Sequence, residues 1–322
     1  MKRSERIAVV VGTHKNQDTL EKCLKSLQPI FHRPEDIIFI DNGSKERIGD
    51  WVAKRFPGCA VVRLDRNQLF CGGYNAGIQL AMDRNYDFVL ISNADTEVIN
   101  PGFTGNLLEA AHRWPKASFL GPLVFLRAPE VVQQTCLQYP RVWHHAITWL
   151  PWRVAPRFFE RQPREETAVE FLNGVCMLCR VEALREIGLM DENMGGYMED
   201  ADWAWRAKEK GWSSVFIPVR SIVHHEDQNG YEPYSLKTFL LKRNTVYWYL
   251  KNGMRYSAIS YSKASIFLEK ARLLSARTSL EREMHDYFFR KLLRSCNGLL
   301  RNEPLGEWFG PPLGPWEMSV ES

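Results

Sequence analysis

The chain has 322 residues, of which 45% are hydrophobic, and a formal net charge of +4 at pH 7. This length and apolar content are enough for one large core or two modest ones. No apolar stretch approaches the roughly 18 residues that a membrane-spanning helix needs. The apolar run from Ile7 to Val11 is too short for a signal peptide, so we expect a cytoplasmic protein.

The first 125 residues alternate short apolar strands with amphipathic helices. Strands are expected at residues 6–12, 36–40, 60–64 and 88–91, and helices at 17–28, 44–56 and 73–85. In the first helix, for example, Leu20, Cys23, Leu24 and Leu27 follow helical spacing. This alternation predicts an α/β fold, with a mostly parallel sheet and helices on both sides.

The rest of the chain changes character twice. Residues 127–167 are rich in Pro, Arg, Trp and His, which predicts a long excursion or flap. Strands at 168–180 and 213–217 and helices at 181–187 and 201–210 then return to the sheet. Helices dominate residues 233–301, and a Pro-rich, irregular tail follows. We expect a main domain over residues 1–252 and a helical extension over 253–322.

The cysteines predict no disulfide framework and no metal site. There are seven, an odd number, scattered along the chain, which fits reduced thiols. Cys176 and Cys179 form the one pair at metal-like spacing, but they lie in an expected strand. Residues three apart on a strand point to opposite faces, so we expect both in core packing.

Glu199, Asp200 and Asp202 place three carboxylates at the expected start of a helix. Like charges this close repel unless a cation, an arginine or a proton offsets them. The helix macrodipole also favours acids at such a position, so the cluster alone leaves both interpretations open. A second acidic group, Asn93 and Asp95, directly follows an expected strand. Ligands bind at the carboxyl ends of parallel strands, which favours a functional site.

Other polar residues follow strands in the same way. Asp41 closes the second strand, and His224 follows a later one, where it is a candidate metal ligand or phosphate partner. Asp95 with substrate phosphate oxygens is enough to hold Mg²⁺ or Mn²⁺. The glycine-rich turn from Asn67 to Gly77 leads into a helix whose N-terminus could face a phosphate. This turn matches neither the dinucleotide-binding nor the P-loop pattern.

Taken in order, these segments resemble glycosyltransferase family 2, the inverting nucleotide-sugar transferases with a GT-A fold, and especially its bacterial rhamnosyltransferase-like members. The resemblance covers roughly residues 5 to 252. It is carried, in chain order, by Val10 to His14, Phe39 to Ser44, Asn67 to Ile78, Asn93 to Asp95, Asn173-Gly174, Ile187 to Glu192, Tyr197 to Asp202, His224-His225 and Arg243-Asn244.

The resemblance implies a donor site. Asp41 would bind the base or ribose of the donor, and Arg243 would hold the leaving diphosphate. Asp95 would be the metal-binding acid, with Asn93 in place of the first acid of a D-x-D motif and His224 as a metal or diphosphate contact. The metal would be Mg²⁺ or Mn²⁺. The nucleotide pocket would be lined by Thr13, Asn67, Gly72, Gly73 and Asn75.

The resemblance also implies an acceptor side. Asp200 would be the general base that takes the proton of the acceptor hydroxyl. Glu199 and Asp202 would raise its proton affinity by like-charge repulsion, and Trp205 would support this side. The expected partners are a nucleotide-sugar donor and a saccharide or lipid-linked saccharide acceptor.

The C-terminal third is basic, with eleven Lys or Arg against four Asp or Glu between residues 251 and 301. It lacks a nucleic-acid reading motif, so no nucleic acid is expected. Contact with an anionic membrane surface fits better. A solvated helical face, or packing in a homodimer, explains the same pattern. Two other functions stay open: nucleotidyl transfer, and non-catalytic binding of a nucleotide sugar.

Overall fold

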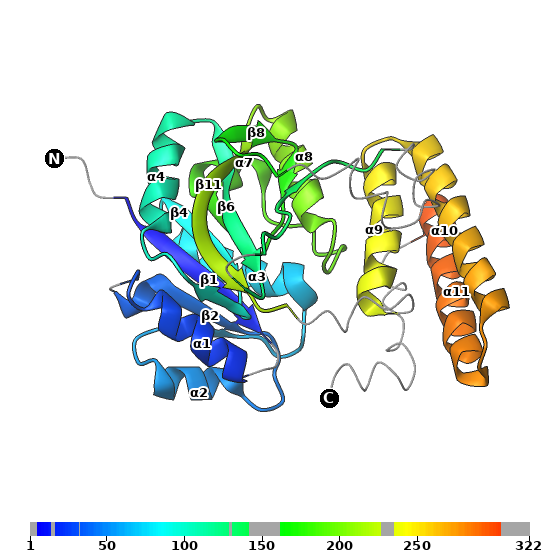
Figure 1. Cartoon of the computed structure of the whole chain (residues 1–322), viewed down its shortest axis with the longest axis horizontal. Coiled ribbons are helices and arrows are strands. Elements are labelled where there is room, and N and C mark those ends of the chain that lie inside the picture. Colours follow the sequence, from blue (N-terminus) through cyan, green and yellow to red (C-terminus); the bar gives the residue numbers. More distant parts are fainter. Residues whose placement is uncertain are drawn as a thin grey trace. The chain divides into compact units, whose positions relative to one another are not determined.

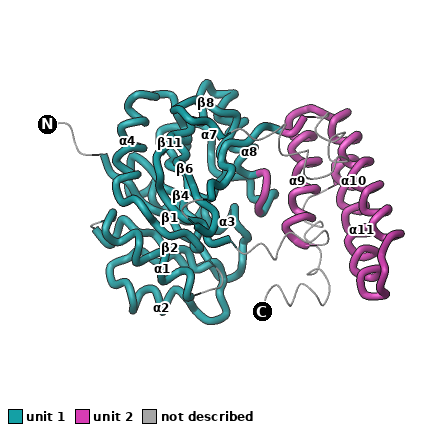
Figure 2. Tube along the Cα trace, viewed as in Figure 1, with its two compact units in different colours: residues 1–139, 157–195, 199–226 teal, residues 140–156, 196–198, 227–322 magenta. Residues whose placement is uncertain are grey.

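A computed structural model of the chain describes residues 5–13, 17–31, 33–128, 131–141, 162–226 and 235–303. Residues 142–161 of the expected excursion and residues 304–322 of the tail expected from Asn302 lie outside these residues. The chain forms two compact units (Figure 2). The first comprises residues 1–139, 157–195 and 199–226, and the second comprises 140–156, 196–198 and 227–322. The domain boundary expected after residue 252 stays a prediction.

The first unit is built on a sheet that has nine strands in the described part of the chain (Figure 1). The strands are β1 (Ile7–Thr13), β2 (Ile37–Asp41), β3 (Ala60–Arg63), β4 (Phe88–Asn93), β5 (Thr96–Val98), β6 (Ala117–Leu126), β8 (Thr167–Val169), β10 (Cys176–Arg180) and β11 (Ser213–His224). Their order is β3-β2-β1-β4-β10-β6-β11-β5, with β8 pairing β11. A separate two-stranded sheet joins β7 (Cys136–Leu137) to β9 (Phe171–Leu172).

The expected mostly parallel sheet is confirmed. Strands β1 to β4 run parallel to one another, and β6 runs parallel to β11. Between these two groups β10 lies antiparallel to both β4 and β6. Because β10 is antiparallel to both β4 and β6, strands β6 and β11 run in the same direction as β1 to β4. The carboxyl ends of β1, β2, β4 and β11 therefore lie at the same edge of the sheet.

Helices cover both faces of this sheet. On one face, Val9, Val11 and Phe39 share a core cluster with α1 (Gln17–Leu27), α2 (Ile48–Arg55) and α4 (Phe103–Arg113). On the other face lie α3 (Leu69–Asp83) and α8 (Glu199–Glu209), with α7 (Val181–Ile187) against α8. Gly77 of α3 packs so closely that a Cβ atom there would lie 2.6 Å from a methyl of Val10.

Several element boundaries differ from the expected ones. Helix α3 begins at Leu69, four residues before the start that was expected at Gly73. Helix α2 begins at Ile48, whose N–H donates to the Ser44 hydroxyl over 2.8 Å, so Ser44 stabilises the turn before the helix. The single strand expected at 168–180 is divided into β8, β9 and β10. Strand β11 continues to His224 because its second half pairs with β5 and β6.

The described helices of the second unit are α9 (Leu236–Lys251), α10 (Arg255–Ser275) and α11 (Ser279–Leu300), which confirms a helical C-terminal extension. Thr278 and Glu281 form a reciprocal capping box at the start of α11. The carboxylate of Glu269 on α10 is fully buried and pairs with Lys242 and Arg272. The Lys242–Glu269 ion pair connects α9 to α10.

All seven cysteines are free thiols. Cys176 and Cys179 are both buried in β10, in agreement with the expected core packing. In the described part of the chain, no helix combines the length and the apolar character that crossing a membrane requires.

Candidate active site

The sheet brings most of the predicted site residues to one edge. Thr13 at the end of β1 pairs with Asp41 at the end of β2. The residue before Thr13 pairs with Asn93 at the end of β4. His224 ends β11, and the next residue donates its backbone N–H to the Asp95 carbonyl over 2.8 Å. Strand direction and register therefore assemble these four positions with Asp95.

Asp95 and His224 face each other directly. The Oδ1 atom of Asp95 lies 3.2 Å from Nε2 of His224, whose other ring nitrogen lies 3.0 Å from Oε1 of Gln133. When Nδ1 carries the proton and donates it to Gln133, the lone pair of Nε2 is directed at the Asp95 carboxylate. A nitrogen lone pair and a carboxylate repel each other unless a cation or a proton lies between them. This geometry suits a pair of ligands for a divalent metal.

Asn93, two residues before Asp95, carries a side-chain oxygen that a ligand could use. Its Oδ1 atom is buried and has no hydrogen-bond partner among the described residues. Within the same residues, no three His, Cys, Asp or Glu side chains come close enough to hold a metal by themselves. A cation held by Asp95, His224 and Asn93 would need oxygens from the substrate or water. Mg²⁺ and Mn²⁺ accept that arrangement, so the residues present fit such an ion.

Glu199 and Asp200 begin α8 beside this edge. The Asp200 carboxylate accepts the N–H of Ala201 over 2.8 Å and is hydrogen-bonded by the Gly174 amide. The residue after Gly174 accepts the N–H of Asn93 over 3.0 Å. Asp200 is thus hydrogen-bonded to Gly174 and Asn93 to the residue that follows Gly174. Asp200 therefore lies at the same edge of the sheet as Asn93.

Burial perturbs both carboxyl groups. Glu199 is only 8% exposed, and its Oε2 atom has no hydrogen-bond partner in the described part of the chain. Burial, and secondly the charge of Asp200, raise the pKa of Glu199 well above its ordinary value. Burial also raises the pKa of Asp200, although hydrogen bonds from Ala201 and Gly174 oppose it. Carboxyl groups with raised pKa values suit proton transfer near neutral pH.

Asp202 and Trp205, on the same helix, have other partners. Asp202 is fully buried and pairs with Nε of Arg206 over 2.8 Å. The charge of Asp202 is offset by this ion pair, so burial rather than like-charge repulsion from Asp202 raises the pKa of Asp200. Trp205 donates its indole N–H to Glu209 over 3.1 Å and packs edge-on against Tyr139, with ring centroids 5.0 Å apart.

Asp41 lies in a contrasting environment. It is 1% exposed, and it accepts backbone N–H groups of Ser44 and Gly49 over 3.0 and 2.9 Å. Burial raises its pKa, but hydrogen bonds from Ser44 and Gly49 and the charge of Arg63 outweigh that effect and hold the pKa below its ordinary value. The observed partners explain an ionised aspartate here, and its contact with a donor stays a prediction.

The glycine-rich turn is fixed by Asn42. Its amide donates to the Leu69 carbonyl over 2.8 Å and accepts the Gln68 N–H over 2.9 Å. Gly72 and Gly73 lie inside the first turns of α3. A Cβ atom at Gly73 would lie 2.8 Å from the Asn42 amide, and one at Gly72 would lie 2.7 Å from the Gln68 side chain. These glycines leave room for protein side chains.

Asn67 and Asn75 also have partners within the protein. The Oδ1 atom of Asn67 accepts the Leu69 N–H over 2.8 Å. Asn75 is 4% exposed, and its amide both donates to and accepts from the backbone of Met190, over 2.9 and 3.0 Å. These contacts account for both side chains without a nucleotide, so the predicted roles of Asn67, Gly72, Gly73 and Asn75 in the donor pocket stay predictions.

Arg243 belongs to the second unit, where it is 1% exposed and donates from Nε to Oδ1 of Asn244 over 2.8 Å. Three residues whose contacts are described in the two units were given no functional role from the sequence: Gln133 and Gly174 in the first unit, and Asn244 in the second. Gln133 lies in the irregular excursion, where no periodic pattern marks it. Gly174 and Asn244 belong to the motifs of the resemblance, which could have drawn attention to them.

Comparison with known proteins identifies the family. Glycosyl transferase family 2 matches residues 8–188. The N-acetylglucosaminyl-diphospho-decaprenol L-rhamnosyltransferase of Mycobacterium tuberculosis is 32% identical over 268 residues, which cover 75% of this chain and 86% of that protein. The chain belongs to glycosyltransferase family 2. It is therefore an enzyme of the glycosyltransferase class, and the resemblance found in its sequence is confirmed.

More distant relatives agree with the fold of this glycosyltransferase. The low-salt glycan biosynthesis hexosyltransferase Agl10 of Haloferax volcanii is 20% identical over 241 residues, covering 74% of this chain and 73% of that protein. The crystal structure of GalNAc-T7 with UDP, GalNAc and Mn2+ matches 95% of the chain with a TM-score of 0.59 at 16% identity, and the chain spans 59% of its length. S. aureus TarS 1-349 matches 90% of this chain and 80% of its own length, with a TM-score of 0.51 at 12% identity. These structures support the GT-A fold.

The raised pKa of Glu199 predicts a pH-dependent stability. A carboxyl group whose pKa is higher in the folded than in the unfolded protein stabilises the folded state at low pH. This stabilisation is complete below the pKa of the unfolded state and is lost as the pH rises through the pKa of the folded state. Glu199→Gln cannot ionise, so its melting temperature relative to the native enzyme should increase as the pH rises from about 5 to about 8.5. Glu209→Gln, which changes an exposed acid of the same helix, is the control. A Glu199→Gln difference that does not vary with pH would contradict a buried, proton-binding Glu199.

Proposed function

We propose that the enzyme transfers a sugar, with inversion at the anomeric carbon, from a nucleoside-diphosphate donor of the dTDP-rhamnose or UDP-sugar type. The acceptor is a hydroxyl of a cell-surface polysaccharide or of a lipid-linked saccharide. The observation that carries this proposal is the 32% identity with a protein named as an L-rhamnosyltransferase of N-acetylglucosaminyl-diphospho-decaprenol. Glu199 and Asp200, whose pKa values are both raised, support catalysis over a non-catalytic binding role.

In this proposal Asp200 is the general base. Its carboxylate is fixed by the N–H of Ala201 and the Gly174 amide, and burial raises its pKa toward neutrality. A base of that strength removes the proton of an acceptor hydroxyl as the hydroxyl oxygen attacks the anomeric carbon. Attack on the side opposite the leaving diphosphate inverts the configuration. Glu199 and Trp205 would support the acceptor side.

The leaving diphosphate needs positive charge. A divalent cation, when bound, would offset the negative charge that develops on this group. Asp95, His224 and Asn93 would hold the cation, and Arg243 would contact the same diphosphate. On the nucleotide side, Asp41 would bind the base or ribose, within a pocket lined by Thr13, Asn67, Gly72, Gly73 and Asn75.

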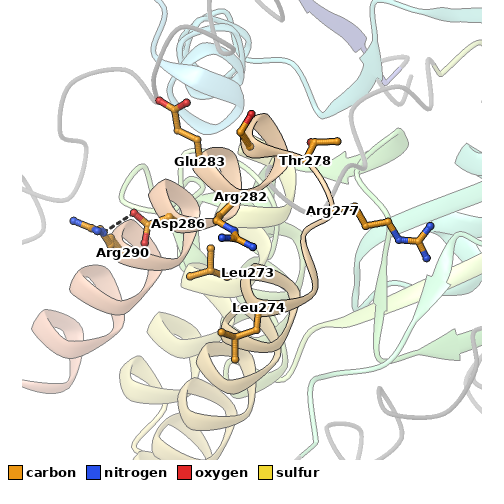
Figure 3. A pocket seen from close by; sticks show the side chains of 9 residues that line it. Leu273, Leu274, Arg277, Thr278, Arg282, Glu283, Asp286 and Arg290 are labelled. Atoms are coloured by element: carbon orange, nitrogen blue, oxygen red, sulfur yellow. Dashed lines mark ion pairs between the residues drawn. The ribbon is translucent and has the colours of Figure 1, made fainter.

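We also propose that the second unit contacts an anionic membrane surface. The hairpin tip, residues 273–282, joins α10 to α11 and leaves Leu274 and Leu280 exposed by 74% and 60%. It borders a cavity of about 790 Å³ (Figure 3). That cavity is lined by Leu273, Leu274, Arg277, Thr278, Ser279, Arg282, Glu283, Asp286 and Arg290. Exposed leucines beside arginines suit the boundary between lipid headgroups and acyl chains.

Part of the basic and apolar pattern of α10 and α11 has another explanation. Phe288 and Leu292 are 1% and 0% exposed, so they belong to the core of the helical unit. Arg272 pairs with Glu269, and Arg290 pairs with Asp286 over 2.8 Å. The membrane proposal therefore rests on the hairpin tip.

Replacing the proposed base should stop turnover and leave donor binding intact. Asp200→Asn keeps the shape of the side chain and removes its basicity, so kcat should fall by about 10² or more. Donor binding, measured by thermal shift, should change little. Glu199→Gln is the comparison, and a larger loss of kcat in that variant would move the base role to Glu199.

Removing a proposed metal ligand should weaken donor binding. With Mn²⁺ present, a panel of dTDP-, UDP- and GDP-sugars should give one donor that raises the melting temperature, because ligands stabilise the state that binds them. EDTA and Asp95→Ala should each reduce that shift. The matched control is Glu97→Gln, which removes the acid of the neighbouring Glu97–His225 pair, whose separation is 3.0 Å. An undiminished shift in EDTA would show that donor binding needs no cation.

Vesicle co-sedimentation tests the hairpin tip. The enzyme should bind phosphatidylglycerol vesicles and lose binding as salt rises, since each basic residue near an anionic surface contributes about 1 kcal/mol. Arg277→Glu with Arg282→Glu should abolish binding. Tyr256→Ser, at a 92% exposed residue near the start of α10, should not. Absence of binding at low salt would favour a solvated face or contact between copies of the chain.

A further inference from the structure

Two strained residues directly precede the acidic pair of α8. Tyr197 and Met198 have φ angles of +63° and +71°, in the left-handed region that residues with a Cβ atom rarely adopt. Neither is a glycine, so the turn persists only if its surroundings hold it. Glu199 and Asp200 follow without an intervening residue, and the direction in which the chain leaves this turn sets where α8 begins.

The side chain of Asn244 binds this turn. Its amide nitrogen donates to the carbonyl of Gly196 over 2.7 Å and to that of Tyr197 over 2.8 Å. Asn244 is fully buried on α9, and these contacts lie within the second unit. A buried amide NH2 group that donates one proton to each of two successive carbonyls fixes the orientation of the two peptides on either side of Tyr197.

The oxygen of the same amide has its own partner. Oδ1 of Asn244 accepts from Nε of Arg243 over 2.8 Å and from a terminal nitrogen of that guanidinium over 2.5 Å. Guanidinium nitrogens only donate and carbonyl oxygens only accept, so a single orientation of the amide satisfies all four contacts. Aspartate, leucine or serine could not reproduce both halves of this pattern.

We propose that Asn244 is a positioning residue for the reaction: it holds the left-handed turn at Tyr197 and Met198 and thereby sets the position of the Asp200 carboxylate, while it orients Arg243. This inference rests on the proposed function, in which Asp200 is the base. Asn244 itself touches no reacting atom. A base displaced by about 1 Å loses about 10²-fold in rate, which is the size of effect expected from releasing the turn.

Asn244→Asp separates the two halves of the contact. Aspartate still accepts from Arg243, but its second oxygen faces the carbonyls of Gly196 and Tyr197 and repels them. We expect kcat to fall about 10²-fold with the donor KM changed less than about threefold. Asn244→Ala removes both halves, so kcat should fall and the donor KM should rise.

Asn252→Ala is the matched control. Asn252 also lies at α9 and donates its amide to a backbone carbonyl, that of Trp248, over 2.8 Å, but this contact stays within its own helix. Its loss should lower the melting temperature without lowering kcat per folded enzyme. A kcat loss in Asn252→Ala equal to that in Asn244→Asp would show that general destabilisation explains both, and would overturn the proposal.

A second variant tests the turn itself. Glycine adopts the left-handed region without steric cost, so Tyr197→Gly in the Asn244→Ala background should recover part of kcat. Lack of recovery, or native kcat in Asn244→Asp, would overturn the proposal. If Asn244→Ala does not fold by itself, the kcat values of Asn244→Asp and of the double variant Tyr197→Gly with Asn244→Ala test the proposal. Native kcat in Asp200→Asn would instead refute the base assignment, so the two failures are distinguishable.

Discussion

The parallel pairing of β1 with β2 on one side and with β4 on the other is the constraint on which the site depends. This register puts Thr13 beside Asp41 and the preceding residue beside Asn93. Strand β10 is antiparallel to β4, so it begins at the same edge, where Gly174 just before it hydrogen-bonds Asp200. A slip of one residue would turn every side chain of a strand to the opposite face. The polar residues of the site therefore lie together only when the central strands pair in this register.

The polar residues at this edge fall into two groups. Asp41 and Asn75 are buried and have several hydrogen-bond partners within the protein, so they hold loops and the start of helices in place. Asn93 and Glu199 each have a buried oxygen without a hydrogen-bond partner among the described residues. Unpaired buried oxygens cost free energy, and native proteins retain them mainly where a ligand, ion or proton completes the site.

Environment, not residue type, separates the two aspartates of the site. Asp41 and Asp200 are both affected by burial, which raises the pKa of a carboxyl group. For Asp41, hydrogen bonds from Ser44 and Gly49 and the charge of Arg63 reverse that effect and keep it ionised. For Asp200, burial dominates. One aspartate is thereby suited to a fixed charge, and the other to accepting a proton.

The sequence alone determined the alternation of strands and helices, the family and the set of polar residues at strand ends. Those features follow from local periodicity and from ordered motifs, which depend on neighbouring residues. It did not determine the antiparallel β10, the start of α3 at Leu69, or the pairing of Asp202 with Arg206. Nor did it reveal that Asn244 holds the turn at Tyr197. These depend on contacts between residues far apart in the chain or on the direction of side chains after packing, and only the tertiary structure brings such groups together.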